Sequence, residues 1–262
     1  MKEIYLRGIS GSFYIVLILA SLFYDQLAFN LVLFLFSSLA IYEFQKLINH
    51  KSFLSISLLF LLLYNLYRLN LNEIFLNGIL MTALAGHIAL LLWLFQNENT
   101  KFNYLSKSIL CVGYMCLSCF FIIALLNTGN IYNPLIVFLF YLLVWSNNSF
   151  AYLIGKKIGK TPLFYDISPK KTWEGFFGGL LFSVITSVIF QYFNSEFSII
   201  LCVSSSLIVS ILSTFGDLIQ SKFKRLAKVK DSGTLIPGHG GFYDRMDSVI
   251  FAAPSFYLLY NY

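Results

Sequence analysis

Residues 197–247 read FSIILCVSSSLIVSILSTFGDLIQSKFKRLAKVKDSGTLIPGHGGFYDRMD, and this stretch decides the fold. The part up to residue 219 is an apolar run long enough to cross a bilayer as one helix. The remainder gathers cations, carboxylates, glycines and a histidine at short spacing. Charged residues kept beside a bilayer are costly and usually functional. The stretch therefore predicts a membrane helix that ends in a chemical site.

The composition of the whole chain predicts an all-α, polytopic integral membrane protein. Of its 262 residues, 58% are hydrophobic and only 11% are charged, whereas a soluble domain carries about 25% charged residues. Apolar runs predict about nine transmembrane helices. They lie near residues 9–24, 28–46, 53–69, 75–95, 106–126, 132–153, 174–192, 197–219 and 247–261.

The basic residues predict the orientation, because cytoplasmic loops of membrane proteins are enriched in Lys and Arg. With a cytoplasmic N-terminus, Arg68 alone among the 18 Lys and Arg lies on the outer side. The loops at 155–173 and 220–246 then share the cytoplasmic side, so their basic clusters can converge on one site. Residues 1–262 are expected to form a single membrane domain, with peripheral N-terminal spans at 1–130 and a catalytic half at 131–262.

The charges also limit the class of partner. A net charge of +6 on so apolar a chain is a poor basis for nucleic-acid binding, so no nucleic acid is expected. Membrane lipids with anionic headgroups, or a nucleotide, fit the clustered cations better.

Helical spacing groups the polar residues of the opening stretch. If the helix continues past its apolar run, four of them share one face: Asp217, Ser221, Lys224 and Lys228. Asp244 and Asp247 are three residues apart, which places both on one side of a helical turn. Adjacent carboxylates repel unless a cation lies between them, and such hard oxygen ligands suit Mg²⁺ together with substrate phosphates.

The glycine-rich turn between these groups is a candidate for binding an anion. Gly238, Gly240 and Gly241 surround His239 and permit a close approach of the backbone to a ligand. The alternative is a solvated juxtamembrane loop that grips anionic lipid, which would leave the paired carboxylates without a use.

Two motifs in the C-terminal half resemble the phosphatidate cytidylyltransferases, also called CDP-diacylglycerol synthases. The first is Ser221-Lys222-Phe223-Lys224-Arg225, then Lys230-Asp231-Ser232-Gly233, then Ile236-Pro237-Gly238-His239-Gly240-Gly241-Phe242-Tyr243-Asp244-Arg245-Met246-Asp247. The second is Ile167-Ser168-Pro169-Lys170-Lys171-Thr172-Trp173-Glu174-Gly175, followed by Gly178-Gly179. Where the family pattern has an aspartate before Ala151, this chain has Asn147-Asn148, so no catalytic carboxylate is assigned there.

The resemblance implies a nucleotidyltransferase of phospholipid biosynthesis that makes CDP-diacylglycerol and pyrophosphate from CTP and phosphatidate. It implies Mg²⁺ as the cofactor and leaves open whether a monovalent cation joins it. A bacterial plasma (inner) membrane location is expected, and the loop charges place the active site on the cytoplasmic side. A homodimer is implied by the resemblance alone.

It also implies roles for the residues of the two motifs. The metal-ligand candidates are Asp244 and Asp247 of the motif together with Asp217, which helical spacing adds. The implied phosphate clamps are Lys224, Arg225 and Arg245, and His239 contacts phosphate or sets the loop. The implied substrate-binding residues are Ser221, Lys170, Lys171, Lys228, Gly238, Gly240 and Gly241.

Two further functions stay open from the sequence. Another CTP-dependent lipid enzyme, of the polyprenol kinase or CDP-archaeol synthase type, would use similar groups. An anion transporter, from a different class, would carry charges near the midplane of several spans, whereas most spans here are nearly free of charge.

Overall fold

The computed structural model describes residues 2–68, 72–96, 101–126, 132–236 and 240–261, with the side chains of residues 2–9, 67 and 68 left out. Over these residues the chain is almost entirely helical. The helices are α1 (Lys2–Tyr24), α2 (Gln26–Leu47), α3 (Leu54–Arg68), α4 (Glu73–Leu94), α5 (Tyr104–Ile109), the π-helix η1 (Leu110–Cys116), α6 (Leu117–Ala124), α7 (Pro134–Ile158), α8 (Trp173–Phe193), α9 (Ile199–Leu226) and α10 (Tyr243–Asn261).

Every predicted apolar run coincides with a helix, and α5, η1 and α6 follow one another along the single run predicted at 106–126. By length and composition, six helical stretches among the described residues could cross a membrane: 26–47, 73–94, 104–124, 134–158, 173–193 and 199–226. The all-α membrane fold is therefore confirmed, whereas nine transmembrane helices and a cytoplasmic N-terminus stay predictions.

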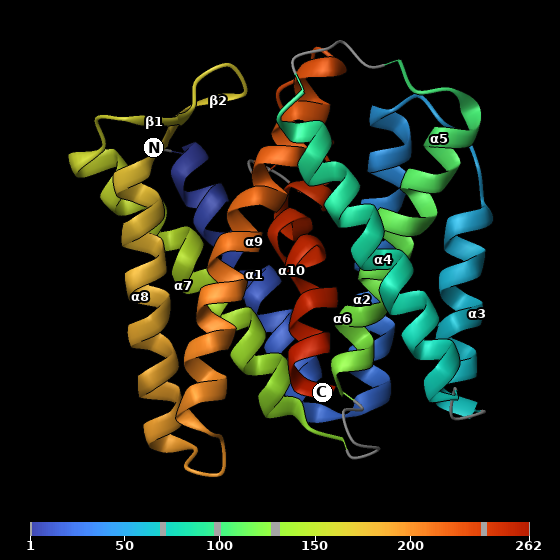
Figure 1. Ribbon diagram of the computed structural model, residues 1–262, viewed down its shortest axis with the longest axis horizontal. Helices are drawn as coiled ribbons and strands as arrows, with labels where there is room; N and C mark the ends of the chain where they lie inside the picture. The colour runs from blue at the N-terminus through green and yellow to red at the C-terminus, as the bar shows by residue number, and fades with distance from the viewer. Residues whose placement is uncertain (1, 69–71, 97–100, 127–131, 237–239, 262) are drawn as a thin grey trace.

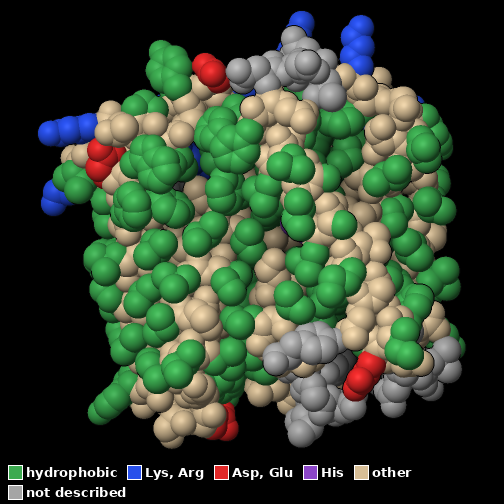
Figure 2. All heavy atoms as spheres, in the orientation of Figure 1, with side chains coloured by type: hydrophobic (Ala, Val, Ile, Leu, Met, Phe, Trp, Pro, Cys, Tyr) green, Lys and Arg blue, Asp and Glu red, His purple; other side chains and the backbone are tan. Residues whose placement is uncertain are grey.

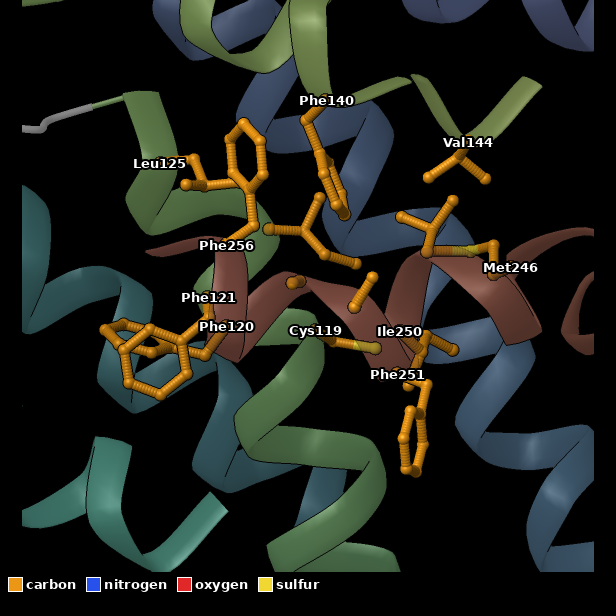
Figure 3. Packing of buried hydrophobic residues seen from close by; sticks show 14 of the residues in the cluster. Cys119, Phe120, Phe121, Leu125, Phe140, Val144, Met246, Ile250, Phe251 and Phe256 are labelled. Atoms are coloured by element: carbon orange, nitrogen blue, oxygen red, sulfur yellow. The ribbon is translucent and has the colours of Figure 1, made fainter. Parts of the chain in front are cut away.

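The last helix, α10, lies inside the bundle (Figure 1). Its residues from Tyr243 to Pro254 are almost all buried, which is expected of a helix that is packed on all sides. Figure 3 shows Met246, Ile250, Phe251 and Phe256 of α10 among side chains from α6 and α7. The short final run is thus a core helix, and the bundle fixes the position of the carboxylates at its start.

Helices α7 and α8 approach closely through small residues. A Cβ atom added at Gly175 would lie 2.7 Å from the Ala151 carbonyl oxygen, and one at Gly179 would lie 2.7 Å from the Asn147 carbonyl oxygen. Small residues allow such backbone contact between helices in membranes. The contact fixes the start of α8, which carries one of the two motifs.

The polar segments meet at one end of the bundle. A small antiparallel hairpin, β1 (Pro162–Phe164) and β2 (Ser168–Thr172), joins α7 to α8, and Figure 1 places it at the same end as the N-terminus. In the view of Figure 2, the Lys and Arg side chains gather at this end, while the flank is largely hydrophobic. The charge asymmetry predicted from the sequence is therefore visible in the fold.

Candidate functional site

The hairpin is held on the start of α8 by two side chains of its own motif. The Thr172 hydroxyl oxygen accepts a hydrogen bond from the Gly175 N–H at 3.2 Å and so caps α8, as Thr does at helix N-termini. The Glu174 carboxylate accepts hydrogen bonds from the N–H groups of Lys160 (3.1 Å) and Thr161 (3.2 Å). These contacts fix Lys171, which lies beside the cap.

Lys171 brings the two polar segments together. Its Nζ atom lies 2.5 Å from Oδ2 of Asp217 on α9. A second contact joins the same segments, because Arg225 Nε donates a hydrogen bond to the Ile167 carbonyl oxygen at 3.3 Å. The predicted convergence of the loop at 155–173 with the motif after residue 220 is therefore confirmed.

A second ion pair lies deeper in the site. Lys224 Nζ is 2.8 Å from Asp244 Oδ1 and 3.0 Å from Gln220 Oε1. The other Asp244 oxygen accepts hydrogen bonds from Ser232 N (2.8 Å), Ser232 Oγ (2.9 Å) and Gly241 N (3.0 Å). Both oxygens of this predicted metal ligand are therefore engaged by the protein.

The environment of Asp244 stabilises its charged form. Burial acts to raise the pKa of this carboxyl group. The Lys224 ammonium and the Gly241 and Ser232 amides outweigh burial, so the pKa lies below its ordinary value. Asp244 is therefore a carboxylate that binds the Lys224 ammonium and the backbone amides of Ser232 and Gly241.

Asp247 is buried one helical turn further along α10. Its Oδ1 accepts a hydrogen bond from Ser248 N at 2.7 Å. The charges of Asp217, Lys171 and Lys224 all act on it. Helix α9 passes very close at this level, because a Cβ added at Gly216 would lie 2.8 Å from the Asp247 carbonyl oxygen. The structure thus brings Asp217 and Asp247 together across the α9–α10 contact.

Three of the four residues predicted on one face lie on α9. Asp217, Ser221 and Lys224 are helical, and Ser221 Oγ is 3.4 Å from Asp217 Oδ1, at the outer limit of a hydrogen bond. The prediction that Lys228 continues this face is wrong, because α9 ends at Leu226. Lys228 has φ 56°, and the next N–H, that of Val229, donates back to the Lys224 carbonyl oxygen at 3.0 Å, which terminates the helix.

The glycine turn is only partly described. Ile236 N donates to the Gly240 carbonyl oxygen at 2.9 Å, and Gly240 has φ 85°, a conformation that favours glycine. Gly241 donates its N–H to Asp244. The predicted residues Gly238 and His239 lie outside the described residues.

The remaining predicted cations lie at the surface of this end. Lys170, Arg225, Lys228 and Arg245 are all exposed. Their long side chains are therefore accessible to a ligand that approaches from the polar end of the bundle.

Sequence reasoning gave no role to two residues that shape the site. Lys222 is buried, and its ammonium donates hydrogen bonds to the carbonyl oxygens of Trp93 (2.5 Å), Leu94 (3.2 Å) and Gln96 (2.7 Å). It therefore caps the end of α4, where the helix dipole favours a cation. Glu43 of α2 is the other; its carboxylate accepts a hydrogen bond from Tyr243 N at 2.9 Å and lies 3.1 Å from Ser232 Oγ.

The position where the family pattern has an aspartate lies near the second carboxylate. Asn148 Nδ2 donates to Ser248 Oγ at 3.1 Å, and Ser248 follows Asp247 directly in the chain. Because Asn148 is an amide and not a carboxylate, it adds no negative charge near Asp247.

The donor set suits a hard divalent ion that brings other ligands. Among the described residues, no three His, Cys, Asp or Glu side chains are grouped closely enough to hold a metal by themselves. Two carboxylates, Asp217 and Asp247, are nevertheless close enough for their charges to interact. The Asp217 side chain is 40% exposed. Mg²⁺ is commonly bound by one or two carboxylates plus substrate phosphates, so these residues fit it.

Comparison with known proteins matches the whole chain to one family. The family model described as "Cytidylyltransferase family" covers residues 5–262. The phosphatidate cytidylyltransferase of Bacillus subtilis (strain 168) is 31% identical, over 99% of this chain and 97% of its own. The phosphatidate cytidylyltransferases of Staphylococcus epidermidis (strain ATCC 12228) and Staphylococcus aureus (strain COL) are 44% and 45% identical over 115 residues, which is 44% of each chain.

Proposed function

This chain belongs to the cytidylyltransferase family, and we propose that it transfers the cytidylyl group of CTP to phosphatidate. The products are CDP-diacylglycerol and pyrophosphate, which makes the protein a nucleotidyltransferase of phospholipid biosynthesis. The observation that carries this function is the family match along residues 5–262. No observation favours a polyprenol kinase, a CDP-archaeol synthase or an anion transporter.

The chemistry of the reaction fits the residues that converge. A phosphate oxygen of phosphatidate attacks the α-phosphorus of CTP, a new P–O bond forms, and pyrophosphate leaves with the electron pair of the broken bond. The attacking phosphate is largely a dianion near neutral pH, because the second pKa of a phosphomonoester is about 6. No strong base is needed, so catalysis rests on positioning and charge neutralisation.

The cations divide into two groups by their exposure. Arg225, Arg245 and Lys170 are exposed and are assigned to the phosphates of the two substrates. Lys171 is paired with Asp217 and becomes available to a phosphate oxygen when Asp217 takes another partner. Arg is well suited to the first role, because its planar guanidinium binds phosphate through two parallel hydrogen bonds.

Asp217 and Asp247 are assigned as the metal ligands. Their mutual repulsion and the exposure of Asp217 support this assignment. Mg²⁺ held there would neutralise charge on the phosphates of CTP. Asp244, whose two oxygens already accept four hydrogen bonds, is assigned to holding the loop in place of direct metal binding.

The polar end of the bundle is assigned to the cytoplasm of a bacterial cell. Lys and Arg side chains gather there in the view of Figure 2, and an excess of such residues is typical of the cytoplasmic side. CTP would reach the site from the cytoplasm and phosphatidate from the membrane. A homodimer and a second, monovalent cation stay predictions.

The function is tested with purified protein in detergent, labelled CTP, phosphatidate and Mg²⁺. Labelled CDP-diacylglycerol is expected, and a chelator should abolish its formation. Product that forms equally well with the chelator would contradict the metal assignment. A protein that binds CTP but forms no CDP-diacylglycerol would contradict the proposed function.

A further inference from the structure

Glu43, in the last turns of α2, is a buried carboxyl group far in sequence from the motifs. Only 2% of the residue is exposed, and burying an acid without partners is costly. Its partners come from residues 232–236 and 240–243, which we together call the anchor loop. Tyr243 N donates to Glu43 Oε2 at 2.9 Å, and Ser232 Oγ lies 3.1 Å from the same oxygen.

The anchor loop is shaped around this carboxyl group. A Cβ atom at Gly233 would collide with Glu43 Oε1, and one at Gly241 would collide with Glu43 Oε2. Glycine at these two positions therefore allows the loop backbone to approach the acid. Both glycines belong to the motif at 221–247 that contains the site residues. The motif therefore includes residues that contact Glu43, which lies outside the motif.

The Ser232 hydroxyl connects Glu43 to the buried ion pair. Its Oγ is 3.1 Å from Glu43 Oε2 and 2.9 Å from Asp244 Oδ2, and Asp244 in turn holds Lys224 at 2.8 Å. The single Ser232 hydroxyl thus lies between the two carboxyl groups and can donate its one proton to either, which connects α2 through the loop to α9. Because members of such networks support one another, loss of Glu43 should be felt at Asp244.

Aromatic contacts fix the same part of the loop on α2. The ring of Phe44 is 5.4 Å from that of Tyr243, and the ring of Phe36 is 4.9 Å from that of Phe242. Edge and tilted pairs at these separations stabilise a contact beyond the burial of their area. Helix α2 thereby packs against the start of α10.

We propose that Glu43 is a positioning residue for the transfer reaction. It holds the anchor loop on α2 and so sets the start of α10, where Asp244, Arg245 and Asp247 lie. The inference rests on the proposed function for its catalytic consequence, while the anchoring itself can be measured without turnover.

The test compares Glu43→Ala and Glu43→Gln with Gln45→Ala as the matched control. Gln45 is also buried on α2, but its amide donates to Ser52 O (2.7 Å) and Ser55 Oγ (2.9 Å), away from the anchor loop. Glu43→Ala should lower kcat/KM for CTP at least about tenfold, as loss of an orienting partner does. Glu43→Gln keeps an acceptor for Tyr243 N and should stay within about threefold of the wild type.

Hydrogen exchange measured by mass spectrometry supplies the readout that needs no activity. Glu43→Ala should speed exchange in the anchor loop and leave residues 48–55 unchanged. Gln45→Ala should speed exchange in residues 48–55 and leave the anchor loop unchanged. If Glu43→Ala does not fold, Ser232→Ala removes the hydroxyl between Glu43 and Asp244 but keeps the Ser232 N–H bond to Asp244. This variant should lower kcat/KM for CTP about threefold or more.

Three results would overturn the inference. They are wild-type kcat/KM and exchange in Glu43→Ala, no recovery in Glu43→Gln, or an equal loss of kcat/KM in Gln45→Ala. An inactive wild-type protein would instead contradict the proposed function, and the exchange data would still decide whether Glu43 anchors the loop.

Discussion

Two lysine–carboxylate pairs lie at the polar end of the bundle, and they differ in how open they are. In the Lys171–Asp217 pair the side chains are 23% and 40% exposed, whereas in the Lys224–Asp244 pair they are 15% and 7% exposed. Four protein donors serve Asp244. Asp217 has Lys171 and a long contact from Ser221.

The difference separates groups that can exchange partners from groups that hold the frame. The Lys171–Asp217 pair is partly exposed, so it should contribute less to stability, about 1 kcal/mol, and cost less to open for a substrate. Opening a buried pair leaves an uncompensated charge and costs about 3–5 kcal/mol. We call Lys171–Asp217 the open pair and Lys224–Asp244 the closed pair. Substitutions at the open pair are expected to affect catalysis, and those at the closed pair are expected to affect folding as well.

Asp217→Asn should have the largest effect on turnover. The change removes a proposed metal ligand, and several kcal/mol of transition-state stabilisation correspond to about 1,000-fold or more in kcat. The thermal unfolding temperature in detergent should change less than for a variant of the Lys224–Asp244 pair, because the lost ion pair is the more exposed of the two. Initial rates at saturating CTP and phosphatidate measure the first effect, and a fluorescence melt measures the second.

Asp166→Asn is the control for this variant. Asp166 is an exposed acid between β1 and β2, so the variant removes the same charge from the same end of the molecule. Its kcat should stay within about twofold of the wild type, as expected of a surface change away from the ligands. Equal losses in the two variants would assign the effect of Asp217 to net charge and not to ligation.

Lys224→Met should be the most destabilising change at the site. It leaves the buried Asp244 carboxylate without its ammonium, and loss of one partner of a buried pair costs about 3–5 kcal/mol of unfolding free energy. Lys171→Met is the matched variant at the open pair and should cost no more than about 1 kcal/mol. Similar losses of unfolding free energy in both variants would remove the distinction between the pairs.

The sequence was sufficient to predict the helices, because membrane helices are apolar runs. It was also sufficient to predict the meeting of the two polar segments, because basic loops tend to lie on one side of the membrane. It also placed Asp217 and Asp247 on helices near this end of the bundle, and their role as metal ligands stays a prediction. It was not sufficient for Glu43, a single acid in an apolar run whose partners are about 200 residues away. Spacing also could not show that α9 stops at Leu226 and that Lys228, two residues later, is left-handed, because both depend on backbone conformation.

Lys222→Met tests whether neighbouring lysines of one motif have different uses. The variant leaves three carbonyl oxygens near the end of α4 without their buried donor, which should cost about 1–3 kcal/mol of unfolding free energy. Turnover at a temperature below the melt should stay within about threefold of the wild type, because Lys222 faces α4 and not the carboxylates.

Lys157→Met serves as the control, because Lys157 is an exposed lysine near the end of α7. It should change the unfolding free energy by less than about 0.5 kcal/mol. A stable Lys222→Met protein with much lower turnover would instead place Lys222 in the substrate site.

Ser221→Ala should have the smallest effect and decides how far the open part of the site extends along α9. The hydroxyl is 3.4 Å from Asp217 Oδ1, a distance at which a hydrogen bond is weak, so its loss should lower kcat/KM no more than about threefold. Ser204→Ala is the control, because Ser204 on the same helix donates to the Leu201 carbonyl oxygen at 3.0 Å, far from the carboxylates.

A different result would place Ser221 in direct contact with substrate or metal. In that case the kcat/KM of Ser221→Ala would fall toward that of Asp217→Asn, while the kcat/KM of Ser204→Ala would stay normal. The open part of the site would then include a full turn of α9, and the weak contact with Asp217 would be the resting position of a ligand-binding hydroxyl.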